Sequence, residues 1–159
     1  MMGATHAMIG ALVGAAIGSA CRNPMVGAAV SGLASLLPDI DNPDSKVGRR
    51  APLLSRAVNA LCGHRNITHT VFFVALCAGA LVLMDREFLG LSPGYMALCA
   101  AAGILSHIAL DSLTKAGTRP FEPVSHLHIK GPLRTGSLYE SVFNLILVSL
   151  TIWMISRAS

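Results

Sequence analysis

The chain has 159 residues, of which 53% are hydrophobic and 13% charged, and its formal net charge is +4 at pH 7. Soluble domains carry about a quarter charged residues, so this composition predicts an integral membrane protein, folded as one domain over residues 1–159. Aromatic residues make up only 5% of the chain, and it has neither a zinc-finger spacing nor a basic recognition helix, so we expect no nucleic-acid partner.

Five apolar stretches follow one another along the chain. They lie at residues 4–21, 24–38, 67–84, 94–115 and 138–156. A helix needs about 20 apolar residues to cross the hydrocarbon core of a bilayer, and several of these stretches are shorter. We therefore expect an all-α, integral membrane helical bundle with about five transmembrane or half-membrane helices. The second stretch is the shortest, and it either crosses the membrane or stops part-way.

The first stretch carries a stripe of small residues. Gly10, Gly14 and Gly18 recur at a spacing of four, and His6 extends the stripe by one turn. Small residues at this spacing let two helices approach closely within lipid. The stripe therefore predicts that His6 points into the bundle rather than towards lipid.

The second stretch ends at Pro38, which begins the sequence Pro38-Asp39-Ile40-Asp41, and we expect this proline to end the helix. Further along, apolar residues recur at helical spacing, with Arg56 and Asn59 on the opposite face. This pattern predicts a short interfacial amphipathic helix on the membrane surface. Its apolar residues are Leu53, Leu54, Ala57, Val58 and Leu61.

The distribution of lysine and arginine predicts the orientation. With five spans, the N-terminus and the loops 39–66 and 116–137 share one side of the membrane. That side carries Lys46, Arg49, Arg50, Arg56, Arg65, Lys115, Arg119, Lys130 and Arg134. The other side carries only Arg22, Arg86 and Arg157. The excess of basic residues predicts that the N-terminus lies in the cytoplasm.

Seven ionisable residues lie at or near the cytoplasmic ends of these stretches. They are His6, Asp39, Asp41, His64, His69, His107 and Asp111. An aspartate within a membrane helix costs about 2.5–3.5 kcal/mol on insertion scales, so such a residue needs a partner. His107 and Asp111 are four residues apart and can face one ion.

A shared metal site accounts for these seven residues. Imidazole and carboxylate ligands suit zinc, manganese or iron better than calcium or magnesium. Seven donors exceed the four positions of one tetrahedral zinc, so two divalent ions, most naturally two Zn²⁺, fit the set better. Two metals close together can activate a water and stabilise the displacement at an ester or phosphoester.

Glu140 and Arg65 are the candidate catalytic residues. Glu140 follows Gly136-Ser137, and it either stabilises the first turn of a helix or acts as a ligand or general base over the metals. Arg65 lies between two predicted ligands and binds either a phosphate oxygen or lipid headgroups. Ser106 and Thr114 are candidates for orienting the ligands through hydrogen bonds.

Several short motifs occur in order along the chain. They are Pro38-Asp39-Ile40-Asp41-Asn42-Pro43, Gly63-His64-Arg65, Thr68-His69-Thr70, Ser106-His107 and Asp111-Ser112-Leu113-Thr114, preceded by His6 and followed by Glu140. The ordered set resembles the YdjM-type family of bacterial membrane-bound metal-dependent hydrolases, described as inner-membrane hydrolases linked to LexA regulation. The resemblance implies a multi-helix protein of the bacterial inner membrane whose histidines and aspartates bind catalytic metal. A more distant similarity to zinc-dependent phospholipase C and P1 nuclease implies phosphoester cleavage.

These observations predict a membrane hydrolase that cleaves a phosphoester or ester bond of a lipid or lipid-linked substrate at the cytoplasmic membrane surface. A metal or proton transporter is the first alternative. It would place its site near the bilayer midplane, often between repeated halves, and no internal repeat is evident. The second alternative is a non-catalytic membrane scaffold with a structural metal. The oligomeric state is not predicted by the sequence.

Overall fold

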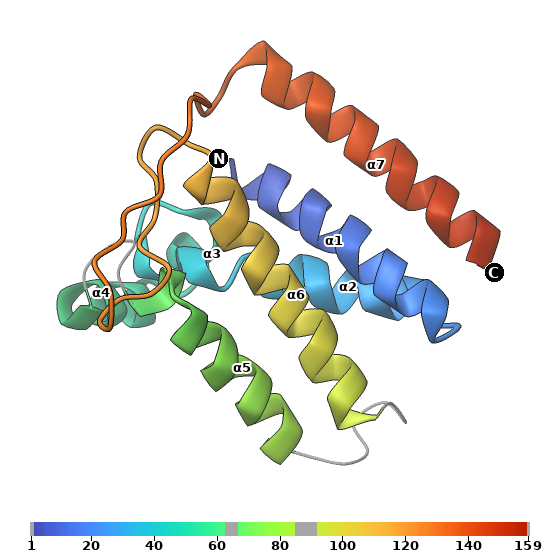
Figure 1. The fold of residues 1–159 in the computed structure, drawn as a ribbon, viewed down its shortest axis with the longest axis horizontal. Helices are drawn as coiled ribbons and strands as arrows, with labels where there is room; N and C mark the ends of the chain where they lie inside the picture. The colour runs from blue at the N-terminus through green and yellow to red at the C-terminus, as the bar shows by residue number, and fades with distance from the viewer. Residues whose placement is uncertain (1, 63–66, 85–91, 159) are drawn as a thin grey trace.

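The structure, a computed structural model, describes residues 2–62, 67–84 and 92–158. The described residues form helices and no sheet, with two isolated β-bridges in the segment that follows α6. The predicted all-α fold class is confirmed (Figure 1). The helices are α1 (Gly3–Ala20), α2 (Pro24–Ala34), η1 (Pro38–Asp41), α3 (Lys46–Arg50), α4 (Pro52–Cys62), η2 (Ile67–His69), α5 (Val71–Met84), α6 (Pro93–Ser112) and α7 (Leu138–Ala158).

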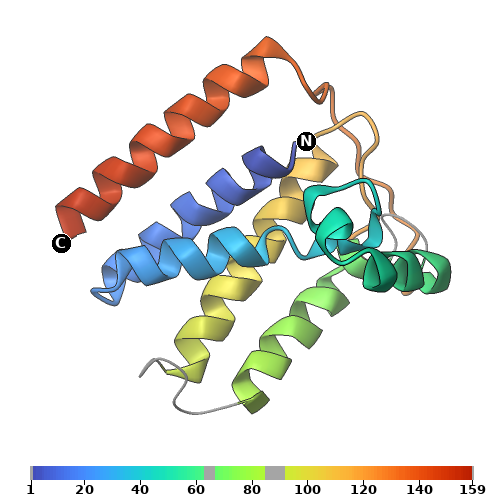
Figure 2. The same ribbon diagram turned by 180° about the vertical axis from the view of Figure 1, so that it is seen from behind.

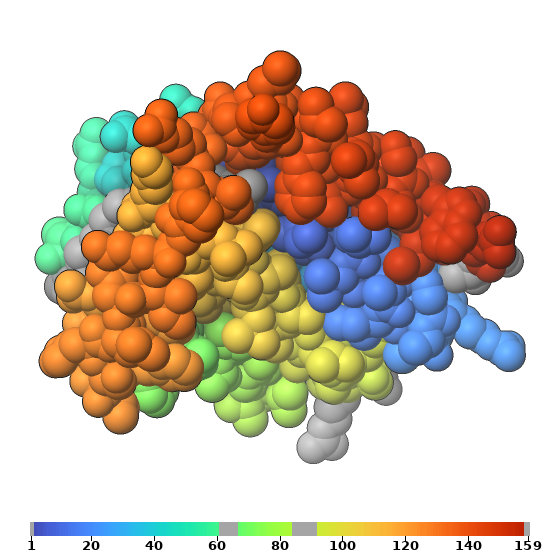
Figure 3. Space-filling view, turned by 45° about the horizontal axis from the view of Figure 1, so that its top comes forward, coloured from blue at the N-terminus to red at the C-terminus, as the bar shows by residue number. Residues whose placement is uncertain are grey.

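The long helices share one polar end. There α1, α5 and α7 begin and α2 and α6 end, and α3, α4 and residues 113–137 gather around it (Figures 1 and 2). Residues 118–135 (orange) lie beside α6 at this end, and α7 (red) lies along α1 (blue) (Figure 3). The directions of the helices therefore bring loops far apart in the sequence to one place, as the sequence predicted.

Glycines bring α1, α2 and α6 into backbone contact. A Cβ atom added at Gly14 would overlap the carbonyl oxygen of Gly27, and one added at Gly103 would overlap the carbonyl oxygen of Ser31. Apolar lipid provides no hydrophobic force between helices, so such close contact is how they associate. His6 is buried, as are the three stripe glycines of α1, which confirms the predicted direction of this face.

Three of the described helices, α1, α6 and α7, are long and apolar enough to cross a membrane, judged by length and composition. By contrast, α2 has 11 residues and is about 16 Å long, against about 30 Å of hydrocarbon core. This length favours the half-membrane alternative for the stretch 24–38.

The helix α2 ends earlier than the sequence predicted. Its last helical residue is Ala34, and the amides of Leu36 and Leu37 bond to carbonyls three residues back, which tightens the chain into a turn. Pro38 then begins η1. A proline suits the first position of a helical turn, because the missing N–H has no partner there. The prediction that Pro38 itself ends α2 was therefore wrong.

The amphipathic helix is present as α4, but one of its faces differs from the prediction. Leu53 and Leu54 are 82% and 53% exposed, which fits a helix lying on a membrane surface. Asn59 was predicted to face outward with Arg56. Instead its side-chain amide donates to the carbonyl oxygen of Asp41 at 2.7 Å, because that buried backbone group needs a donor.

Candidate metal centre

Six of the seven predicted ligands lie in the described residues, and all six meet at the polar end. They are His6 from α1, Asp39 and Asp41 from η1, His69 from η2, and His107 and Asp111 from α6. Five of these side chains are at most 1% exposed, and only Asp39, at 17%, reaches the surface. The site is thus a buried cluster that opens at Asp39.

Five of these six residues have ligand atoms that fall into two overlapping groups, whereas Oδ2 of Asp41 lies beside Nδ1 of His69, at 3.4 Å, and belongs to neither group. The Nε2 atom of His107 lies 3.2 Å from Nε2 of His69, 3.7 Å from Oδ2 of Asp111 and 3.8 Å from Oδ1 of Asp39. The Nε2 atom of His6 lies 3.1 Å from the other carboxylate oxygen of Asp111. In each of the two groups the ligand atoms all lie within 4.8 Å of one another: His6, His107 and Asp111 form one, and Asp39, His69 and His107 form the other.

A backbone carbonyl fixes the tautomer of His107. Its Nδ1 atom lies 2.6 Å from the carbonyl oxygen of Ser35. A carbonyl can only accept, so we assign the ring proton to Nδ1, and Nε2 of the neutral ring carries a lone pair. That lone pair faces the carboxylates of Asp39 and Asp111. Histidines that bind metal usually donate their other ring N–H to a carbonyl or carboxylate in this way.

Thr68 gives His69 the same tautomer. Its hydroxyl donates to Oδ2 of Asp41 at 2.5 Å and lies 3.1 Å from Nδ1 of His69. Since the hydroxyl proton is used by the carboxylate, the hydroxyl oxygen accepts from Nδ1–H of His69. The Nε2 atom of His69 therefore also carries a lone pair directed into the site.

These two lone pairs lie too close together for neutral, metal-free rings. Two acceptors 3.2 Å apart repel each other unless a cation lies between them. In a tetrahedral zinc site with bonds of about 2.0–2.1 Å, two ligand atoms lie about 3.3–3.4 Å apart. The separations of 3.1–3.8 Å in the cluster bracket that value. The residues therefore fit a zinc ion.

His6 completes the cluster on the α1 side. Its ring stacks on His107 with centroids 3.7 Å apart. It is 1% exposed, and among the described residues its Nδ1 atom has no hydrogen-bond partner. A buried polar nitrogen rarely stays unsatisfied, so His6 retains capacity for a ligand.

Burial also affects the carboxylate at the opening. It raises the pKa of Asp39 above its ordinary value, because the charged form loses hydration. Asp41 and Asp111 raise that pKa further, while His6 and His69 oppose the rise. A bound divalent cation would reverse the balance by stabilising the carboxylates.

Glu140 is held at the start of α7. Its Oε1 atom accepts from the backbone N–H of Met2 at 2.7 Å and from the hydroxyl of Thr5 at 2.6 Å, and Oε2 accepts from the N–H of Gly136 at 2.7 Å. Glu140 thus ties the start of α7 to the start of α1, which favours the structural alternative. Its action as a general base stays a prediction.

The remaining predicted residues have separate outcomes. His64 and Arg65 lie outside the described residues. The hydroxyl of Ser106 donates to Gly103 within α6, whereas that of Thr114 donates to the carbonyl of Asp111 and supports this ligand's backbone.

Sequence reasoning missed two groups that orient the ligands. Thr68 lies in the motif Thr68-His69-Thr70, and its hydroxyl next to a histidine in the sequence was the one signal that it could orient that histidine. The carbonyl of Ser35 leaves no side-chain pattern at all.

The comparisons with known proteins show the family of the chain. The family model described as YdjM inner membrane protein matches residues 1–159. The chain belongs to this family. It is 34% identical over 157 residues to the uncharacterized protein YvsG of Bacillus subtilis (strain 168), covering 96% of this chain and 91% of that protein.

A second relative covers less of the chain. Over 87 residues the chain is 37% identical to inner membrane protein YdjM of Escherichia coli (strain K12), covering 54% of this chain and 43% of that protein. No solved structure shows significant similarity to the chain. The resemblance read from the motifs is confirmed. The chain is a membrane protein of the YdjM family with residue groups that can hold a metal ion.

Proposed function

We propose that this protein is a zinc-dependent hydrolase of the bacterial inner membrane that cleaves a phosphoester or ester bond of a lipid or lipid-linked substrate. The observation that carries the proposal is the pair of Nε2 atoms of His69 and His107. They lie 3.2 Å apart, and each has its proton fixed on the opposite ring nitrogen. Such a pair, surrounded by carboxylates, is suited to a divalent cation.

The described residues complete one ion site. Both candidate groups use His107, and one Nε2 atom binds one ion, so the two groups represent one position with alternative ligands. His64 is the predicted donor left for a second ion, because Asp41 accepts from Thr68 and lies beside Nδ1 of His69. When bound, zinc polarises a substrate oxygen and lowers the pKa of its water.

The chain's own residues then hold and admit the substrate. Asp39 lies at the opening, so it is the ligand that an incoming headgroup meets first. Arg65 is the predicted partner of a phosphate oxygen. The stacked rings of His6 and His107 close the opposite wall and exclude bulk water from the ion.

We place the site on the cytoplasmic side. The name of the family supports the inner membrane, and exposed basic residues at the polar end support the orientation. These residues include Lys46, Arg49, Arg50, Lys115 and Arg119. A periplasm-dependent alkaline phosphatase fused to the C-terminus should be active, and an inactive fusion beside an expressed, folded protein would contradict this orientation.

The position of the site supports a hydrolase over a transporter. A transporter site is expected near the bilayer midplane, whereas these ligands lie within the first turns of α1 and the last turns of α6. A scaffold with structural metal would share the geometry, so hydrolytic turnover is the observation that distinguishes it.

The test combines metal analysis with turnover. Protein purified in detergent without chelators should contain about one or two zinc ions per chain and hydrolyse a member of a phosphoester and phospholipid panel. His107→Ala should lose both zinc and turnover. The matched control is His126→Ala, since His126 is 80% exposed on a loop.

Each result that departs from this expectation contradicts a different part of the proposal. Metal-free wild-type protein would contradict the metal centre itself. Retained zinc without turnover on any substrate would favour the scaffold or the transporter, and manganese or iron in place of zinc would revise the ion alone.

A further inference from the structure

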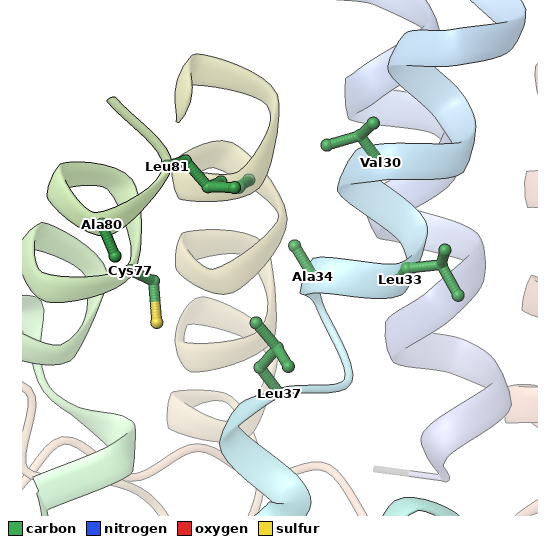
Figure 4. Close-up of a pocket in the computed structure, with 8 residues that line it drawn as sticks. Val30, Leu33, Ala34, Leu37, Cys77, Ala80 and Leu81 are labelled. Atoms are coloured by element: carbon green, nitrogen blue, oxygen red, sulfur yellow. The ribbon is translucent and has the colours of Figure 1, made fainter. Parts of the chain in front are cut away.

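An apolar groove lies between α2 and α5. Ala34 and Leu37 stand on the α2 side and Ala80 and Leu81 on α5, with α6 behind (Figure 4), and Ala100 of α6 also lines the groove. Its volume is about 410 Å³, within the range of about 300–1,000 Å³ that is usual for ligand pockets. All the residues that line it are apolar.

The groove exists because small side chains lie between larger ones. Both α2 and α5 pack against α6, and Ala34, Cys77 and Ala80 leave the space between them unfilled. Val30, Leu37 and Leu81 border this space (Figure 4). Hydrocarbon fills such a space readily, whereas a polar ligand would find no hydrogen-bond partner among these side chains.

One end of the groove is lined by the segment that leads into the metal centre. Leu37 stands two residues before Asp39, the ligand at the opening of the site. Ala34 precedes Ser35, whose carbonyl oxygen holds the Nδ1 atom of His107. A chain that lies in the groove therefore has one end at the segment that leads from α2 to Asp39.

We propose that this groove binds one acyl chain of a membrane lipid and presents the lipid's phosphoester headgroup to the metal centre. The assignment rests on the proposed hydrolase function and names its substrate as a lipid that enters from the bilayer. The connection between the groove and the segment that carries Asp39 favours an acyl chain over a second copy of this protein as the occupant. A helix from a second copy would lie along α2, which has only 11 residues, and would leave the opening at Asp39 without a headgroup.

The groove acts by orientation rather than by hydrophobic transfer. Bilayer hydrocarbon is as apolar as the groove, so moving a chain between them gains little. Holding the chain fixes where the headgroup lies, and a misplacement of about 1 Å at a reacting centre can lower the rate about a hundredfold. Long-chain substrates should therefore depend on the groove, and short-chain, water-soluble phosphoesters should not.

The experiment compares two alanines of α5. Ala80 lines the groove, whereas Ala75 is exposed elsewhere on the same helix. Wild type, Ala80→Phe and Ala75→Phe are reconstituted in phosphatidylethanolamine and phosphatidylglycerol vesicles that contain a phospholipid with a diazirine at the end of its acyl chain. Cross-linked peptides, zinc content and turnover of long-chain and short-chain phosphoesters are measured, and Ala80→Leu serves as a milder second variant.

The proposal expects cross-links concentrated on residues 30–37 and 77–81 in wild type and Ala75→Phe. In Ala80→Phe these cross-links and the long-chain turnover should fall at least about tenfold, with zinc content and short-chain turnover retained. Ala80→Leu should give the same pattern with a smaller decrease.

Two results would overturn the groove. One is cross-linking spread evenly over α5 and equal in all variants, and the other is a chain–chain dimer trapped through Cys77, which would assign the groove to a second copy. Results that contradict the proposed hydrolase function differ from results that contradict the groove. Groove cross-links in an inactive, zinc-loaded protein would support the acyl site and contradict the enzyme, whereas full long-chain turnover in Ala80→Phe would contradict the groove alone.

Discussion

The two sides of α2 differ in how they meet the rest of the molecule. On one side, Gly27, Ser31 and Gly32 lie against the backbones of α1 and α6; we call this the sealed side. On the other, Val30 and Leu33 border the groove that α5 leaves unfilled; we call this the open side. One helix of 11 residues thus contributes to a rigid contact and to an open cleft.

The difference shows how one short helix combines close backbone contact with an unfilled apolar groove. Glycines on the sealed side fix the distance between His6 and His107, which come from different helices. On the open side, the small side chains of Ala34, Cys77 and Ala80 leave the space between α2 and α5 unfilled. Small side chains thus give close contact on one side of this short helix and an unfilled groove on the other.

The strongest test of the sealed side is Gly14→Ala. The added methyl would overlap the carbonyl oxygen of Gly27, and backbone cannot move aside as a side chain can. We expect a loss of about 3 kcal/mol in the free energy of unfolding, at the upper end for overpacking. Thermal unfolding in one detergent, followed by circular dichroism, measures it.

Gly79→Ala is the matched control on α5, because no atom lies within 4 Å of its added Cβ. It should leave stability unchanged or raise it by up to about 1 kcal/mol through helix propensity. Equal melting temperatures for Gly14→Ala and wild type would contradict the sealed contact.

A second substitution tests whether the sealed side also positions a ligand. Gly103→Ala would press against the carbonyl of Ser31, one turn before His107 on α6. We expect zinc affinity to fall about 10–100-fold, the usual effect of disturbing the support of a metal ligand. Competition with a fluorescent chelator measures the affinity. Gly94→Ala on the same helix has no atom within 4 Å and should bind zinc as wild type does.

A third substitution tests whether Glu140 holds α7 against α1. Glu140→Gln removes the charge that strengthens the hydrogen bonds from Met2, Thr5 and Gly136. We expect a loss of about 1–2 kcal/mol in the free energy of unfolding, with zinc content unchanged. Glu122→Gln is the control and should lose less, because Glu122 pairs with the exposed Arg119 at 3.8 Å. Unchanged stability with abolished turnover would instead identify Glu140 as the general base.

The smallest effect is expected on the open side. Leu33 is 70% exposed, so Leu33→Ala should change the free energy of unfolding by less than about 0.5 kcal/mol. This change removes three carbon atoms, whereas Gly14→Ala adds one, yet Gly14→Ala should have the larger effect. Chemical denaturation of the two variants side by side measures the contrast, and a large loss for Leu33→Ala would contradict an open groove.

Much of the site could be predicted from the sequence because helix direction is encoded in the order of apolar stretches. The stripe from His6 to Gly18 gave the inward face of α1, and the order of spans brought Asp39 and His107 to one end. These inferences need only periodicity and alternation, which are local properties.

The rest depended on contacts that no local pattern contains. Asn59 was assigned outward because polar residues usually face water, yet it is used by the carbonyl of Asp41. Two of the three partners of Glu140, Met2 and Thr5, lie at the start of the chain, more than a hundred residues earlier. The groove is defined by the space between Ala34 and Ala80, which periodicity cannot measure.

The hydrogen bond between Nδ1 of His107 and the carbonyl of Ser35 has a consequence for mutagenesis. An alanine scan leaves every backbone carbonyl in place, so no such variant can reveal this partner. The tautomer of His107 is instead a property of the register of α2 against α6. A slip of one residue would present a different carbonyl to the ring, and the nitrogen available to an ion would change with no change in composition at the site.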